Sequence, residues 1–397
     1  MKKALALILA AGMTFSLAAC GDKTANTQTE TNTQTEAGNT AETDLDYANM
    51  TEDDLISKIK DQTNVTAEEY IDLVSTFSNV TITEDMELED NITKKAIQKL
   101  KDNGATFPEA SEYIGTLLKS DAPQVRGYAI QQMSSILGVS DEDVSASKEL
   151  LKNETEPYVI CCALNTFGNE GANDPDIGEF LLNSAKNENS KVREQAAIAI
   201  GSSWNKGLDG AVDTMITLMS DSDKDVRSRA YGFSGSLGDE KIIEPIVSML
   251  NNPDDYELHG NGIDSLNKLW YDFPFHENTS EAAYKAAMDY FRTTPRTHDI
   301  PSWTAISSLK NKNDRSYDQW RAKATYFNAD EFAQIMTDII KDENASSFAR
   351  TGAVEVIAAH CSKETFDSLA TVVNGLTDKD AGDVQEKYQS QANELNK

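Results

Sequence analysis

The sequence predicts an all-α fold, a right-handed α-solenoid of stacked helical hairpins. The main observation is a motif of Val, Ile or Leu followed four residues later by Ala or Gly, which recurs about every 33 residues. Polar or proline-containing turns precede most of these motifs. Self-similarity at this period is typical of helical units that bury their apolar faces only against their neighbours. The motif anchors are Ile92/Ala96, Val125/Ala129, Val159/Ala163, Val192/Ala196, Val226/Ala230 and Leu258/Gly262.

The first segment, residues 1–19, is predicted to be an export signal. It has two lysines followed by an apolar run that is too short for a standard transmembrane helix. The run ends in Leu17-Ala18-Ala19-Cys20-Gly21, which resembles the lipobox of bacterial lipoproteins. The resemblance implies that Cys20 becomes the N-terminus and carries a lipid. That lipid would anchor an exported protein to the outer face of the cell membrane.

Residues 20–45 are predicted to be a disordered tether behind the lipidated cysteine. This stretch is rich in Thr, Asn, Gln and Glu and has no apolar periodicity. Residues 46–107 are then expected to form an N-terminal helical cap or divergent repeats.

Residues 108–270 carry the clearest helical hairpins. In the first, Glu109 to Lys119 places Ile114, Leu117 and Leu118 on one face, and a turn containing Pro123 follows. A second helix is predicted from Gln124, and Gly138 ends it. The same plan recurs in the following repeats with different residues.

The Val-Arg-x-x-Ala core behind an acidic or polar turn, as in Asp223 to Ala230, resembles the HEAT repeat. The resemblance implies a ladder in which each arginine pairs with a turn acid of a neighbouring unit. Arg126, Arg193 and Arg227 fit the arginine position and Lys94 lies near it, whereas Ile160 and His259 depart from it. The alternative, that these arginines contact a ligand, stays open.

Residues 271–397 are expected to be divergent HEAT-like repeats with a C-terminal cap. Two hairpins are predicted, from Ala282 to Leu309 and from Phe332 to Ala359, and 366–376 would cap the array. The polar residues 378–397 are interpreted as a frayed tail or a terminal helix.

The formal net charge of -30 predicts weak attraction to nucleic acid, and no nucleic-acid partner is expected. One region departs from this balance: residues 270–330 hold many aromatic residues, and residues 285–325 within them carry eight basic side chains against four acidic ones. Such a basic aromatic segment could bind an anionic or carbohydrate ligand. The alternative is that the aromatic residues pack between irregular repeats. The candidate binding residues are Trp270, Arg292, Arg296, Trp303, Arg315, Trp320 and Arg321.

No catalytic, metal or cofactor site is predicted. The histidines match no metal-ligand spacing, and the calcium-loop-like run from Asp221 has Val226 where glycine is required. His360 and Cys361 are adjacent, so they could not face each other on a helix as base and nucleophile. The protein is expected not to be an enzyme.

These observations predict a membrane-anchored extracytoplasmic lipoprotein whose HEAT-like solenoid is a protein-binding or scaffolding surface. Its partners would be the membrane, through the lipid on Cys20, and a protein of the cell envelope. The alternative function is a lipoprotein that binds a carbohydrate or an anionic solute through the basic aromatic segment.

Overall fold

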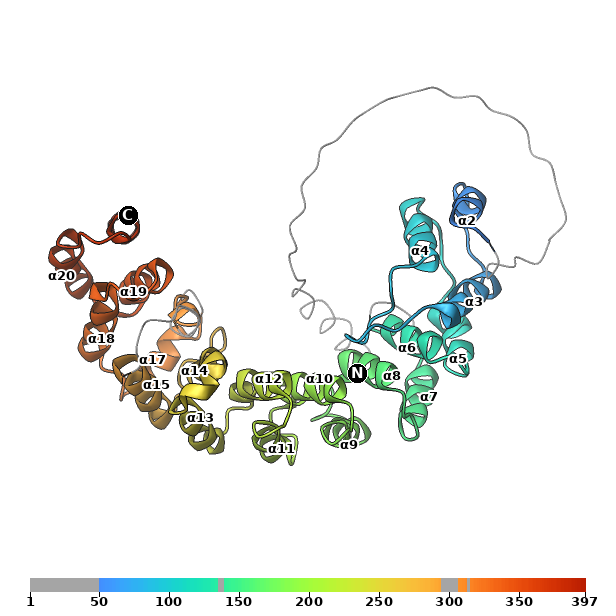
Figure 1. The fold of residues 1–397 in the computed structure, drawn as a ribbon, viewed down its shortest axis with the longest axis horizontal. Coiled ribbons are helices and arrows are strands. Elements are labelled where there is room, and N and C mark those ends of the chain that lie inside the picture. Colours follow the sequence, from blue (N-terminus) through green and yellow to red (C-terminus); the bar gives the residue numbers. More distant parts are fainter. Residues whose placement is uncertain (1–49, 135–138, 294–305, 313–314) are drawn as a thin grey trace, which may run out of the picture. The chain divides into compact units, whose positions relative to one another are not determined.

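The structure is a computed structural model that describes residues 50–134, 139–293, 306–312 and 315–397 (Figure 1). The chain divides into two compact units, Met1–Ser147 and Lys148–Lys397. Cys20, Arg296 and Trp303 lie outside the described residues. None of the helices in the described ranges is long and apolar enough to cross a membrane.

The first unit is helical, with short irregular connections. Threonine side chains begin two of its helices: Thr51 accepts a hydrogen bond from Asp54, and Thr66 forms a reciprocal capping box with Glu69. Among the described residues, extended pairing is limited to two isolated bridges. The elements are α2 (Glu52–Ile59), α3 (Ala67–Ser75), η2 (Thr76–Asn79), α4 (Ile92–Asp102), η3 (Ala110–Glu112), α5 (Ile114–Leu117), α6 (Pro123–Gln132) and the greater part of α7 (Asp141–Leu151).

The second unit is a stack of helical hairpins arranged in two layers (Figure 1). The second helices of successive hairpins pack on one another, α8 on α10, α10 on α12 and α12 on α14. The early elements are α8 (Pro157–Phe167), α9 (Pro175–Ser184), α10 (Ser190–Ile200), η4 (Ser203–Asn205), α11 (Ala211–Leu218), α12 (Lys224–Ser234), η5 (Gly235–Leu237), η6 (Glu240–Ile242), α13 (Ile243–Leu250), η7 (Pro253–Leu258) and α14 (His259–Trp270).

The later part of this unit continues the pattern less regularly. Helix α18 packs on α19, and α19 packs on α21. The sequence left open whether residues 378–397 form a frayed tail or a terminal helix. In the structure they contain a helix, α21, whose Val384 is fully buried. The elements are α15 (Glu281–Thr293), α17 (Tyr317–Lys323), α18 (Ala329–Lys341), α19 (Ser347–His360), α20 (Lys363–Asn374) and α21 (Ala381–Leu395).

Turn chemistry explains where these helices begin. Asp174 and Asp223 each accept hydrogen bonds from two backbone amides at the start of α9 and α12, and Asn189 caps α10. Pro157 and Pro175 occupy the first helical position, where no amide hydrogen is needed. The polar residues ahead of the anchors Val192 and Val226 are therefore helix caps.

Small residues allow successive second helices to approach closely. Ala196 and Ala230 are fully buried between layers, and Gly235 lies directly against the backbone of Ser265. The anchors Val192 and Val226 are also fully buried. The predicted all-α solenoid of HEAT-like hairpins is confirmed.

Candidate functional site

Arg193 connects two successive repeats. Its Nη1 donates to the carbonyl oxygens of Asn187 (2.8 Å) and Glu188 (3.0 Å), in the turn before its own helix. Its Nε and Nη2 donate to the two carboxylate oxygens of Asp221, at 2.7 and 2.8 Å, in the next turn. This bidentate bond lowers the pKa of Asp221 below its ordinary value. The pairing implied by the HEAT resemblance is therefore present at Arg193.

Other residues at this ladder position also bind their own turn. Arg126 donates to the carbonyls of Ser120 and Asp121, both at 2.9 Å, and Arg227 donates to those of Asp221 (2.8 Å) and Ser222 (3.2 Å). Lys94 donates to the carbonyl of Leu88, and His259 Nε2 lies 3.3 Å from that of Asn252. His259 departs from the arginine pattern in sequence but keeps the contact with the turn. Each of these side chains therefore has a structural contact with a backbone carbonyl of the turn before its own helix.

One arginine–aspartate pair of this ladder, which we call a rung, was not predicted from the sequence. Arg350 of α19 is 0% exposed; it donates to both carboxylate oxygens of Asp378, at 2.6 and 2.9 Å, and to the carbonyl of Ile340. Arg350 and Asp378 are 28 residues apart, the same separation as Arg193 and Asp221. Ala349-Arg350-x-x-Ala353 was the available signal, with Ala349 in place of the usual valine.

We expect Arg193→Ala to lower the free energy of unfolding by about 2 kcal/mol, because it removes charged hydrogen bonds at a mostly buried position. Arg227→Ala should cost less, about 1 kcal/mol, since its described bonds reach turn carbonyls. Urea unfolding of both variants and an Arg193→Ala/Asp221→Asn double-mutant cycle would measure this. Equal losses with no coupling between Arg193 and Asp221 would contradict the ladder.

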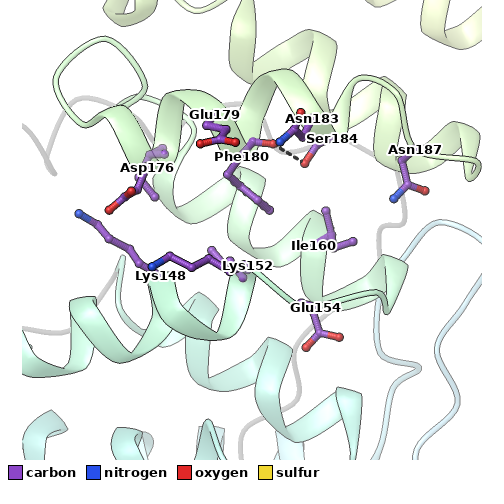
Figure 2. A pocket seen from close by; sticks show the side chains of 12 residues that line it. Lys148, Lys152, Glu154, Ile160, Asp176, Glu179, Phe180, Asn183, Ser184 and Asn187 are labelled. Carbon is purple, nitrogen blue, oxygen red and sulfur yellow. Dashed lines mark hydrogen bonds between the residues drawn. The ribbon is translucent and has the colours of Figure 1, made fainter.

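The ladder is interrupted at α8, where Ile160 occupies the arginine position. The opening there is a cavity of about 480 Å³ within the second unit (Figure 2). Figure 2 shows the Phe180 ring reaching from α9 toward the space between Lys152 and Ile160, with Asn187 near the far end. The lining residues are Lys148, Leu151, Lys152, Glu154, Ile160, Asp176, Ile177, Glu179, Phe180, Asn183, Ser184 and Asn187.

The two described tryptophans of the basic aromatic segment belong to the core. Trp270 and Trp320 are both 0% exposed, and their rings lie 5.8 Å apart. Trp270 Nε1 donates to Asn267 at 2.9 Å, and Trp320 Nε1 donates to the carbonyl of Trp270 at 2.6 Å. The packing alternative therefore accounts for these two side chains.

The described arginines of that segment have separate surroundings. Arg292 forms ion pairs with Asp289 (2.9 Å) and Glu331. The Arg321 guanidinium lies over the ring of Phe327, 4.5 Å from its centroid, and Arg315 is exposed. No described contact joins these three arginines into one site.

Three exposed aromatic residues lie on loops that follow second helices: Trp204 after α10, and Phe273 and Phe275 after α14. They are 50%, 39% and 55% exposed. We call these two loops, residues 202–207 and 271–278, the aromatic edge. Lys206 joins them, because its Nζ lies 3.5 Å from Asn278 Oδ1 and 3.6 Å from Glu277.

The loop after α14 is held in place from inside. Buried His276 packs edge-on against Tyr271, with ring centroids 4.5 Å apart, and its Nδ1 lies 2.7 Å from the Tyr271 carbonyl oxygen. Burial raises the pKa of neighbouring Asp272 to about 6. The contacts of His276 fix the loop that carries the exposed Phe273 and Phe275, and neither these two residues nor Trp204 was predicted from the sequence.

The adjacent His360 and Cys361 are structural. His360 Nε2 lies 2.6 Å from the Leu309 carbonyl and Nδ1 lies 3.0 Å from the Tyr317 hydroxyl, so the ring donates to Leu309 and accepts from Tyr317. Burial lowers the pKa of His360 to about 4 and raises that of Cys361 to about 12. Within the described ranges, no three His, Cys, Asp or Glu side chains are placed to hold a metal ion.

A match to a known protein family supports the repeat class. Residues 178–267 match the family of HEAT repeats, and this stretch runs from α9 to α14. No curated protein matches the chain. Among solved structures, the chain is similar to the crystal structure of an engineered protein, with 17% identity and a TM-score of 0.40, over 86% of this chain and 88% of that one. HEAT-like repeats suggest a protein-interaction scaffold.

Proposed function

We propose that this protein is a lipid-anchored extracytoplasmic scaffold that docks a protein partner of the cell envelope through its aromatic edge. The observation that carries the proposal is the exposure of Trp204, Phe273 and Phe275 on neighbouring loops of an acidic, repeat-built protein. Large aromatic residues are enriched where protein interfaces concentrate their binding energy. The internal anchors of the edge reduce the entropy that docking would cost.

The anchoring part of the proposal is supported by the lipobox-like sequence ending at Cys20 and by the polar tether that follows it. A lipid on Cys20 would hold the repeats near the membrane surface. We expect Cys20→Ala to abolish incorporation of radiolabelled palmitate. Incorporation that is unchanged by Cys20→Ala would contradict a lipid anchor at this residue.

The docking part can be tested by crosslinking the tagged full-length protein in cells. A triple variant, Trp204→Ser/Phe273→Ser/Phe275→Ser, should lose the partner captured by the wild type, because it removes exposed aromatic surface and leaves the buried core intact. Phe348→Ser is the matched control, since Phe348 is 70% exposed at the start of α19, outside the edge. Retention of the partner by the triple variant would refute docking at the edge.

A further inference from the structure

At α8 the ladder lacks both charged residues of a rung, the arginine and the acid of the next turn. Arg193 faces Asp221 and Arg350 faces Asp378, each acid being 28 residues further along the chain. At α8 the arginine position holds Ile160, and the turn residue that corresponds to Asp221 is the neutral Asn187. Asn187 aligns with Asp221 because each accepts a hydrogen bond from the backbone amide two residues later. Both Ile160 and Asn187 line the cavity of about 480 Å³.

The cavity has the features of a site for a long basic side chain. Ile160 and the ring of Phe180 offer apolar contact to an alkyl stem, and an aromatic face attracts a cation. Asn183 and Asn187 supply amide oxygens, which accept hydrogen bonds from guanidinium or ammonium groups.

The charges around the cavity also favour a cation. The lysines that line it are matched by acids outside the lining: Lys148 pairs with Asp174, and Lys152 pairs with Glu149 at 2.8 Å. The acids of the lining are Glu154 and, on α9, Asp176 and Glu179. They would attract a positive group to the opening.

We propose that this cavity is a socket for an arginine or lysine side chain of the docked protein. The incoming cation would occupy the position in this repeat that the Arg193 guanidinium occupies in the next one. The partner would thereby supply the cation that the ladder lacks at α8. The inference rests on the proposed docking function for the source of this side chain. The socket itself can be tested without that partner.

The direct test uses purified full-length protein in detergent micelles, labelled at isoleucine methyl groups. The probe is the peptide acetyl-Gly-Arg-Gly-amide, and the control is the same peptide with citrulline, which keeps the shape of arginine without its charge. We expect the arginine peptide to shift the methyl signals of Ile160 and Ile177. The citrulline peptide should need a concentration at least about tenfold higher for the same shift. Equal shifts with both peptides, or none with either, would overturn the proposal.

A variant that fills the socket provides the second test. Ile160→Arg/Asn187→Asp copies the Arg193–Asp221 pair, so it should remove the peptide-induced shift at Ile177 and raise the melting temperature. Phe180→Ala should also weaken the shift, and it keeps the test usable if the double variant fails to fold. Lys186→Ala is the matched control, because Lys186 is exposed on the same turn but does not line the cavity. A shift that persists in both Ile160→Arg/Asn187→Asp and Phe180→Ala would place the peptide elsewhere.

Crosslinking separates failure of the socket from failure of the docking function. If the aromatic edge captures a partner that Ile160→Arg/Asn187→Asp still binds with unchanged affinity, the socket is not part of that complex. If the arginine peptide binds the cavity but the edge captures no protein, the docking function fails while the basic-side-chain site stands. Both the socket and the docking function are supported if the partner no longer binds Ile160→Arg/Asn187→Asp, and if changing the partner's own basic residue to glutamine also abolishes binding.

Discussion

Replacing Asp378 by asparagine is expected to lower the free energy of unfolding by about 3 kcal/mol, because it leaves the fully buried Arg350 without its counter-charge. Urea unfolding would measure the loss. The exposed pair of Lys363 and Asp367 is the matched control, and Asp367→Asn should change stability by less than about 0.5 kcal/mol. Adding Arg350→Met to Asp378→Asn should recover part of the loss, since the buried charge is then gone.

The same ion pair predicts a dependence on pH. The Arg350 guanidinium holds the pKa of Asp378 at about 2, below its ordinary value of 3.8. A lowered folded-state pKa stabilises the protein above the unfolded value, and this contribution is lost as the pH falls through the folded value. The stability difference between wild type and Asp378→Asn should therefore narrow between about pH 4 and pH 2. A constant difference across that interval would show that Asp378 is not held as an ion pair.

Gly235→Ala is expected to destabilise the stack by about 3 kcal/mol, the upper part of the range for overpacking. An added Cβ would lie 2.5 Å from the Ser265 carbonyl oxygen and 2.6 Å from its Cα. These are backbone atoms of α14, so they cannot rotate away. The substitution would force α12 and α14 apart, and thermal unfolding would report the loss.

Gly232→Ala is the matched control on the same stretch of chain. Its Cβ would find Asn261 atoms at 3.6 Å, an ordinary contact, and Gly232 lies inside α12. Alanine should therefore stabilise the helix by about 0.5 to 1 kcal/mol. If both glycine substitutions shift stability in the same direction by similar amounts, close packing at Gly235 is not the determining feature.

The repeat architecture could be predicted because its cause is local and periodic. Apolar anchors such as Val192 and Val226 recur at fixed spacing, and caps such as Asn189 and Asp223 begin the helices that follow. Arg193 could also be placed, since its partner lies in the next repeated turn. Arg350 was missed because Ala349 replaces the usual valine and the repeats there are longer.

Composition alone could not distinguish the exposed aromatic residues from the buried ones. The Trp320 indole reaches the carbonyl of Trp270 across 50 residues, a contact that no local pattern specifies. Trp204, Phe273 and Phe275 lie in loops, where apolar periodicity gives no information about exposure. The cavity at Ile160 likewise becomes visible only when the missing arginine is compared with the rungs beside it.

Photocrosslinking from the aromatic edge tests the docking proposal most directly. A benzophenone amino acid would replace Phe275 in the full-length protein in cells, and the same group at Phe348 would be the control, because both side chains are exposed. The docking proposal predicts one discrete adduct with an envelope protein from position 275 and a much weaker one, or none, from position 348. No adduct from position 275, or the same adduct from both positions, would contradict it.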